Sequence, residues 1–225
     1  YCMGTLYWQL NDSWPVVSWS GIDYYGNWKA LHYQAKRAFA PLIVNPVHEN
    51  GHLNVYLLSD KLEDSAGMTL EMRLMDFNGK KLQQESVKVE APANSSVKVC
   101  GKDLDEWADE KLRKECYLLL SLKDKHGKEV ARDVHYFAPT KELDLPQTMV
   151  KSKIKVVEDG VCEVTLSASK LAKDVFVQIP YQGARFTDNF FDLLPGETHR
   201  IMITSPEIKK GINPEILVKH IRETY

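Results

Sequence analysis

The chain of 225 residues is long enough for one large domain or two ordinary ones. Hydrophobic residues make up 44% of it and charged residues 27%, a composition that excludes intrinsic disorder. The 29 basic and 31 acidic residues give a formal net charge of −2, so no overall field would attract nucleic acid or an anionic membrane. No apolar run approaches the roughly 18 residues of a membrane-spanning helix. We therefore expect a soluble protein whose partners include neither nucleic acid nor a membrane.

The chain begins with Tyr1 and lacks the basic, apolar and small-residue regions of a signal peptide. Such a beginning is typical of an excerpt or a processed product, so the localisation cannot be read from this end.

Cysteine and histidine residues form no metal-binding pattern. His48 and His52 are four residues apart, but turn-forming residues between them prevent the shared helix face that a metal pair needs. The four cysteines have irregular spacing and favour buried free thiols, with a Cys100–Cys116 disulfide as the alternative. We predict no metal and no cofactor.

Residues 1–40 contain ten of the 22 aromatic residues and four of the five tryptophans. A continuous apolar run over 3–10 predicts a strand buried on both faces, and turn-forming residues follow it. Apolar residues at helical spacing predict a helix over 28–39, with Asn27 as its N-cap. One strand and one helix cannot bury ten aromatic side chains. The segment therefore has the pattern of one strand–loop–helix unit of a (β/α)8 barrel, in which the chemistry lies at the C-terminal ends of the strands.

The next region, residues 41–143, predicts an immunoglobulin-like β-sandwich. Leu70, Met72 and Leu74 alternate with charged residues, as in a sheet with one solvated face. Only 103–114 has a helical pattern. The predicted strands are 42–47, 53–58, 68–77, 80–90, 95–99, 116–123 and 129–137.

A polar connector over 140–148 leads to a second small β-sandwich, so the third predicted domain is 144–225. Its predicted strands are 154–157, 162–167, 174–178, 185–191, 198–204 and 215–225. The fold class is thus mainly β, with two sandwiches that follow a barrel fragment.

The aromatic segment is also the strongest functional signal. Trp8 ends the predicted strand and is followed by the polar residues Asn11 and Asp12 and by Trp14. Flat apolar rings beside hydrogen-bonding groups suit sugars, whose C–H faces stack on indole. Trp28 fits a core role better and Trp19 fits either role, whereas turn-capping is the commonest role of an aspartate such as Asp12.

The order of these residues resembles a known family. Residues 4–15 read GTLYWQLNDSWP, 18–20 read SWS and 22–33 read IDYYGNWKALHY, which closely resembles the end of the catalytic barrel in β-mannosidases of glycoside hydrolase family 2. TDNFFD at 187–192, before a PGE turn, is similar to the closing β-sandwich of the same proteins.

The resemblance implies the C-terminal fragment of a retaining exo-β-mannosidase that removes terminal β-D-mannose from oligosaccharides. Its acid/base and nucleophile glutamates would lie on earlier barrel strands, so we expect no catalytic residue and no hydrolysis from this chain alone. Trp8 matches the tryptophan that floors the sugar pocket, which such families often hold by a cis peptide, here to Gln9. Asn11, Asp12 and Trp14 match the loop at the edge of that pocket.

The implied partners are a β-mannoside oligosaccharide in the full-length enzyme and an upstream catalytic barrel. A bacterial source would suggest a secreted or periplasmic enzyme, and an animal source a lysosomal one. Two alternatives stay open: a carbohydrate-binding module with a platform formed by Tyr181, Phe186, Phe190 and Phe191, and a structural module that braces the barrel or forms a homodimer. We also expect residues 1–40 to expose a large apolar patch, or to cover it with the first sandwich or a second copy.

Overall fold

The computed structural model describes residues 4–224, and the chain divides into two compact units. One unit is Ala40–Pro146, and the other combines Tyr1–Phe39 with Gln147–Tyr225. The N-terminal aromatic segment therefore shares a unit with the C-terminal sandwich. Among the described residues, no helix has the length and apolar character that crossing a membrane requires.

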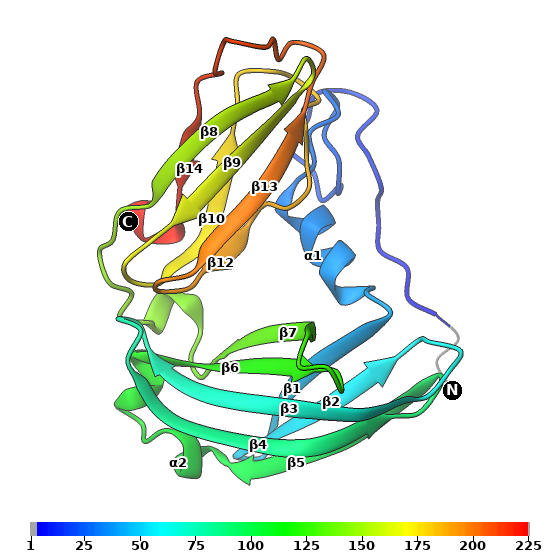
Figure 1. Cartoon of the computed structure of the whole chain (residues 1–225), viewed down its shortest axis with the longest axis vertical. Coiled ribbons are helices and arrows are strands. Elements are labelled where there is room, and N and C mark those ends of the chain that lie inside the picture. The colour runs from blue at the N-terminus through cyan, green and yellow to red at the C-terminus, as the bar shows by residue number, and fades with distance from the viewer. Residues whose placement is uncertain (1–3, 225) are drawn as a thin grey trace. The chain divides into compact units, whose positions relative to one another are not determined.

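Residues 40–146 form a sandwich of two antiparallel sheets (Figure 1). The three-stranded sheet has the order β1-β2-β5, and the four-stranded sheet has the order β4-β3-β6-β7. The strands are β1 (Leu42–Glu49), β2 (His52–Ser59), β3 (Ser65–Asp76), β4 (Lys81–Ala91), β5 (Ser95–Asp103), β6 (Cys116–Lys123) and β7 (Glu129–Tyr136). The seven strands that the sequence predicts in this region are thus all present.

Side-chain alternation explains why these residues form a sandwich. Leu70, Met72 and Leu74 of β3 are buried in the core between the sheets, together with Leu118, Leu120 and Leu122 of β6. Glu71, on the opposite face of β3, forms an ion pair of 2.5 Å with Lys123. A period of two with one apolar and one charged face is what a sheet with one wet side requires.

The predicted helix over 103–114 is wrong, because it is interrupted. Helix α2 (Leu104–Trp107) has a capping box between Asp103 and Glu106 and ends where Ala108 becomes extended. The carboxylate of Asp109 then accepts a hydrogen bond of 2.8 Å from the Leu112 N–H, and the 3-10 helix η1 (Leu112–Lys114) follows. Trp107, the last residue of α2, is buried in the sandwich core.

The C-terminal sandwich has sheet orders β11-β13-β9-β8 and β12-β10-β14. Its core includes Val164, Leu166, Val175, Ile201 and Ile203, each fully buried. The strands are β8 (Lys151–Glu158), β9 (Val161–Ser167), β10 (Ala172–Gln178), β11 (Arg185–Phe186), β12 (Phe191–Leu193), β13 (Thr198–Thr204) and β14 (Leu217–Lys219).

Two predicted strands of this sandwich are wrong in extent. The strand over 185–191 is broken into β11 and β12, because Phe190 adopts a φ of 52° and the Asn189 side chain takes over pairing with the backbone of Val177. The strand over 215–225 shrinks to β14 and is followed by the 3-10 helix η3 (Ile221–Glu223), while Tyr225 lies outside the described residues. Another 3-10 helix, η2 (Thr140–Glu142), lies in the polar connector.

The N-terminal segment differs most from its prediction. Residues 4–10 form no strand, and Leu6 and Trp8 are 99% and 75% exposed. No neighbouring strand pairs with them among residues 4–224, and an unpaired backbone cannot form a sheet. Met3, the first residue of the predicted run, lies outside the described residues.

Helix α1 (Ala30–Ala38) follows this segment, but Asn27 does not cap it. The N-cap position belongs to Lys29, whose side chain makes no capping hydrogen bond. Asn27 is instead held by Asp23, whose carboxylate accepts hydrogen bonds from the backbone and side-chain N–H groups of Asn27 at 2.8 and 2.9 Å.

The predicted free thiols are confirmed for the three described cysteines. Cys100, Cys116 and Cys162 carry no disulfide, so the alternative Cys100–Cys116 bridge is wrong. Cys2 lies outside the described residues. Burial raises the pKa of the Cys116 thiol to about 12, as expected for a structural core cysteine.

Candidate functional site

Three tryptophans of the N-terminal segment have their rings in solvent. Trp8, Trp14 and Trp19 are 75%, 66% and 67% exposed. Asn11 is also exposed, and the peptide bond between Trp8 and Gln9 is cis, as the family resemblance predicts. Large exposed rings beside an amide are the groups that the sequence proposes for a sugar site.

Backbone hydrogen bonds hold this loop against residues 21–29. The N–H groups of Gly21 and Ile22 donate to the carbonyl oxygens of Gln9 and Leu10 at 3.0 and 2.9 Å. The Asp12 N–H donates in turn to the Ile22 carbonyl at 3.0 Å. A Cβ at position 21 would lie 3.4 Å from the Leu10 carbonyl oxygen, so glycine suits this close approach.

The buried side chain of Asp12 holds the tryptophan loop in place through hydrogen bonds and an ion pair. Its carboxylate is 1% exposed and accepts a hydrogen bond of 2.5 Å from the Ser18 hydroxyl. The Lys29 ammonium lies 3.0 Å from the other carboxylate oxygen and also donates to the Ser20 hydroxyl at 2.7 Å. The Ser18 hydrogen bond, with help from Lys29 and Ser20, outweighs burial and lowers the pKa of Asp12 to about 2.

These contacts revise the predicted role of Asp12. Both of its carboxylate oxygens have protein partners, so the side chain is not free to bind a ligand directly. Lys29, the ionic partner of Asp12, is the residue of this candidate site that the sequence did not indicate. Its position 17 residues after Asp12 offers no local signal for an ion pair.

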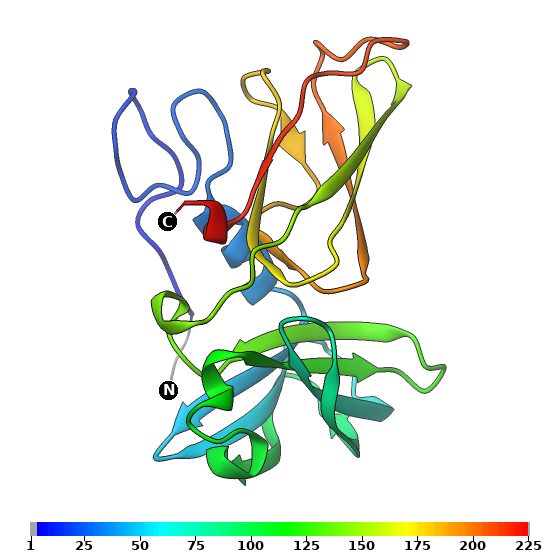
Figure 2. The ribbon, with the colours of Figure 1, turned by 90° about the vertical axis from the view of Figure 1, so that its left-hand side faces the viewer.

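Helix α1 packs beside the C-terminal sandwich, as Figure 2 shows. Arg37 forms an ion pair of 2.8 Å with Asp188 and donates to the Phe190 carbonyl at 2.8 Å. Lys36 donates to the Thr187 carbonyl at 2.7 Å. The helix is therefore joined to the loop between β11 and β12.

The electrostatics of this junction follow from burial and from the neighbouring charges. Burial tends to raise the pKa of Asp188, but the hydrogen bond from His199 and the charge of Arg37 hold it below its ordinary value. Tyr33 of α1 is 1% exposed, and burial with the Asp188 charge raises the pKa of its hydroxyl to about 12. Both groups thus stay in their ordinary charge states near neutral pH.

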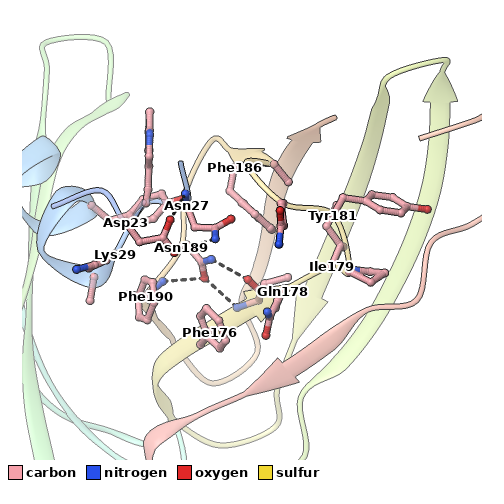
Figure 3. A pocket seen from close by; sticks show the side chains of 17 residues that line it. Asp23, Asn27, Lys29, Phe176, Gln178, Ile179, Tyr181, Phe186, Asn189 and Phe190 are labelled. Atoms are coloured by element: carbon pink, nitrogen blue, oxygen red, sulfur yellow. Dashed lines mark hydrogen bonds between the residues drawn. The ribbon is translucent and has the colours of Figure 1, made fainter. Parts of the chain in front are cut away.

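A pocket of about 430 Å³ lies where residues 23–33 meet residues 176–190 (Figure 3). Three of the four predicted platform residues, Tyr181, Phe186 and Phe190, line it. The fourth, Phe191, is 7% exposed and belongs to the sandwich core. Periodicity could not indicate this pocket, because its two sides are about 150 residues apart in the sequence.

Residues 4–224 contain no group of three or more His, Cys, Asp or Glu side chains that could hold a metal ion.

Comparison with known proteins gives two domain matches. Residues 51–142 match the Mannosidase Ig/CBM-like domain, and residues 145–224 match an Ig-fold domain of mannosidases. Both matches agree with the two sandwiches of the structure.

Relatives match over most of the chain. Beta-mannosidase A of Neosartorya fischeri is 28% identical over 219 residues, which cover 91% of this chain and 23% of the relative. Beta-mannosidase A of Aspergillus terreus is 29% identical over 227 residues, with 94% and 24% covered. The chain thus spans about a quarter of the length of these relatives.

Solved structures of glycoside hydrolases also match over most of the chain. A β-D-mannosidase from Dictyoglomus thermophilum matches with a TM-score of 0.77 and 29% identity, over 95% of this chain and 26% of that chain. An exo-chitosanase from Amycolatopsis orientalis, at a TM-score of 0.70 and 21% identity, shares the fold over 95% of this chain and 29% of that chain. The domain matches, the relatives and the first of these structures together show that the chain corresponds to a C-terminal portion of a β-mannosidase of glycoside hydrolase family 2.

Proposed function

We propose that the chain is the C-terminal part of a retaining exo-β-mannosidase that removes terminal β-D-mannose from oligosaccharides. Residues 1–40 would complete the catalytic barrel, and residues 41–143 and 144–225 would be accessory sandwiches. The observation that carries the proposal is the set of exposed rings of Trp8, Trp14 and Trp19 on a loop whose anchor, Asp12, is itself buried. Rings that face solvent from a fixed loop are prepared for a ligand.

Exposed apolar side chains in the same segment support an upstream barrel as the missing partner. Leu6 and Val17 are fully exposed, and Leu10 and Val16 are more than half exposed. Monomeric proteins rarely leave such a patch uncovered. Barrel strands before residue 4 would pair with residues 4–10 and cover these side chains; a second copy of the chain is the alternative cover, which sedimentation at several concentrations would detect.

The proposed roles follow from position. Trp8 stacks on the sugar ring at the floor of the pocket, while Trp14 and the Asn11 amide contact the sugar at its edge. Asp12 positions the loop through Ser18 and Lys29, without touching the sugar. The acid/base and nucleophile glutamates belong to earlier strands of the barrel.

The test compares this chain with the longer polypeptide that includes the barrel. Hydrolysis of p-nitrophenyl β-D-mannopyranoside is measured for both, with p-nitrophenyl β-D-glucopyranoside as the control substrate. We expect activity on the mannoside from the longer polypeptide only. Hydrolysis by the chain alone, or a preference for the glucoside, would contradict the proposal.

A second candidate function is favoured by the pocket beside β10. A carbohydrate-binding role for the C-terminal sandwich would use Tyr181, Phe186 and Phe190, which line that pocket. This role is compatible with the first one.

A further inference from the structure

The pocket between the N-terminal segment and the C-terminal sandwich is separate from the exposed tryptophan loop. None of Trp8, Asn11, Trp14 and Trp19 lines it. Its volume of about 430 Å³ lies within the range of roughly 300–1,000 Å³ that small-molecule sites occupy. We propose that this pocket is a second sugar-binding site, which holds a neutral β-mannoside oligosaccharide.

The first argument is charge. Asp23 and Lys29 are charged residues of the lining, and the side chains of both already have partners inside the protein. Both carboxylate oxygens of Asp23 accept hydrogen bonds from Asn27, and the Lys29 ammonium is paired with Asp12. An anionic ligand would find no unpaired ammonium in Lys29, and a cationic ligand would have to compete with Asn27 for the Asp23 oxygens, so an uncharged ligand suits the pocket better.

The second argument is the aromatic wall. Ring contacts run from Trp28 to Tyr33 at 5.6 Å between centroids and from Tyr33 to Phe190 at 5.9 Å. Phe176 of β10 continues the series, 4.9 Å from Phe190. Figure 3 shows Phe176 beside Phe190, with Phe186 farther along the pocket. Ring surfaces of this kind pair with the C–H faces of a sugar.

The third argument is the supply of free hydrogen-bonding groups. The side-chain amides of Gln178 and Gln182 line the pocket, are exposed, and have no hydrogen-bond partner within residues 4–224. Each amide offers two N–H donors and one carbonyl acceptor, which match the hydroxyl groups of a sugar. The Asn189 amide differs, because its oxygen accepts from the N–H groups of Val177 and Phe190 and its NH2 group donates to the Val177 carbonyl.

The fixed geometry of the pocket is the fourth argument. The Gly183 N–H donates to the Asn27 side chain at 3.0 Å, and Arg185 donates to the Gly26 carbonyl. The Arg185 guanidinium also lies 5.3 Å from the centre of the Trp28 ring. These contacts join the two sides of the pocket before any ligand arrives, so little conformational entropy would be lost on binding.

The choice of a β-mannoside rests on the proposed function, since the same polypeptide would meet these sugars at its catalytic site. Binding at the pocket would hold the substrate chain on the enzyme and raise its local concentration near the tryptophan loop.

The test is isothermal titration calorimetry of the chain with mannobiose and mannohexaose, with cellobiose as the control sugar. Ala30 lines the pocket and is exposed at the first residue of α1, so Ala30→Trp fills the pocket without removing a contact. Ala38→Trp, at the exposed last residue of the same helix, is the matched control. We expect mannohexaose binding to weaken about tenfold or more with Ala30→Trp and to stay unchanged with Ala38→Trp.

A second pair of variants removes one polar contact. Gln178→Ala should weaken binding about 2- to 10-fold, whereas Gln147→Ala, at an exposed glutamine that does not line the pocket, should have no effect. Because both glutamines are exposed, neither variant should change the melting temperature.

Trp8→Ala separates this proposal from the proposed function. The pocket proposal predicts that Trp8→Ala leaves mannohexaose binding unchanged. Binding that disappears with Trp8→Ala and survives Ala30→Trp would overturn the second site and leave the mannosidase assignment intact. Absence of all binding to the unmodified chain, or binding of cellobiose alone, would also overturn it, whatever the hydrolysis experiment shows.

Discussion

The ammonium of Lys29 lies 3.0 Å from the carboxylate of Asp12, a residue 17 positions earlier in the chain. The same ammonium donates to the Ser20 hydroxyl at 2.7 Å, so it closes the loop that carries Trp14 and Trp19. This ion pair connects the start of α1 to the candidate sugar site. The ion pair explains how the exposed rings of Trp14 and Trp19 can be held on a fixed loop although the rings themselves are largely in solvent.

Replacing Lys29 by methionine should loosen this loop. The variant leaves the buried carboxylate of Asp12 without its counter-charge but keeps the Ser18 hydrogen bond, so the pKa of Asp12 should rise from about 2 toward its ordinary value of 3.8. The near-UV circular dichroism of the tryptophans should weaken at neutral pH. Lys170→Met, at an exposed lysine with no partner among the described residues, should leave the signal unchanged. An unaltered spectrum for Lys29→Met would show that the ion pair does not position the loop.

The ion pair between Arg37 and Asp188 should stabilise the docking of α1 on the C-terminal sandwich. A double-mutant cycle with Arg37→Ala and Asp188→Ala should give a coupling energy of about 1 kcal/mol, because the pair is only partly exposed and is hydrogen-bonded. The pair Arg113–Asp105, in which the aspartate is 87% exposed, is the control and should give about 0.5 kcal/mol or less. Both cycles are measured by urea unfolding. Equal coupling energies for Arg37–Asp188 and Arg113–Asp105 would show that Arg37 does not stabilise the docking of α1 more than an exposed surface pair would.

His135 should make the stability of the first sandwich depend on pH. Burial, with the nearby charge of His48, lowers the pKa of His135 to about 4 from an ordinary value of 6.5. The unfolded chain therefore binds a proton between these values that the folded chain does not, so stability falls as the pH falls from about 6.5 to about 4. The loss should reach at most about 3 kcal/mol.

Urea unfolding of the chain and of His135→Leu at several pH values tests this. The variant should lose most of the pH dependence over that window, whereas His126→Leu, at an exposed turn, should keep it. If the free energy of unfolding depends on pH equally in the unmodified chain and in His135→Leu, the effect belongs to other groups.

The buried thiols should react only when the chain unfolds. Cys116 and Cys162 are fully buried, and burial raises the pKa of both thiols, so the reactive thiolate is scarce in the folded chain. Alkylation with iodoacetamide at pH 8, followed by peptide mass spectrometry, should label both residues slowly in buffer and rapidly in guanidinium chloride. Rapid labelling in buffer, or recovery of a Cys100–Cys116 disulfide, would be inconsistent with the structure.

Local patterns were sufficient for the sandwich between residues 40 and 146. Alternation of Leu70, Met72 and Leu74 with charged residues fixes both the strand and the face it buries, and such information is entirely local. The turn between β3 and β4 also has a local signal, since Asn78–Gly79 is a typical hairpin-turn pair and Gly79 adopts a φ of 92°.

Predictions failed where side-chain partners that the local pattern does not indicate decide the structure. Residues 4–10 have the composition of a buried strand, but among the described residues they have no strand to pair with. Asn27 has the right type for an N-cap, yet it is held by Asp23 and by the Gly183 N–H. The candidate site shows the same division: its tryptophans were evident from composition, whereas the buried state of Asp12 depends on Lys29, which only the folded chain brings near.

The measurement that tests the account most directly is the effect of Trp8→Ala on the longer polypeptide. If Trp8 floors the sugar pocket, kcat/KM for p-nitrophenyl β-D-mannopyranoside should fall at least about 100-fold. The melting temperature of the variant, measured alongside, shows that the longer polypeptide stays folded. Trp107→Phe, in the core of the first sandwich, should instead lower the melting temperature and leave kcat/KM nearly unchanged. An unchanged kcat/KM for Trp8→Ala would contradict the assignment of the aromatic segment to a sugar-cleaving site.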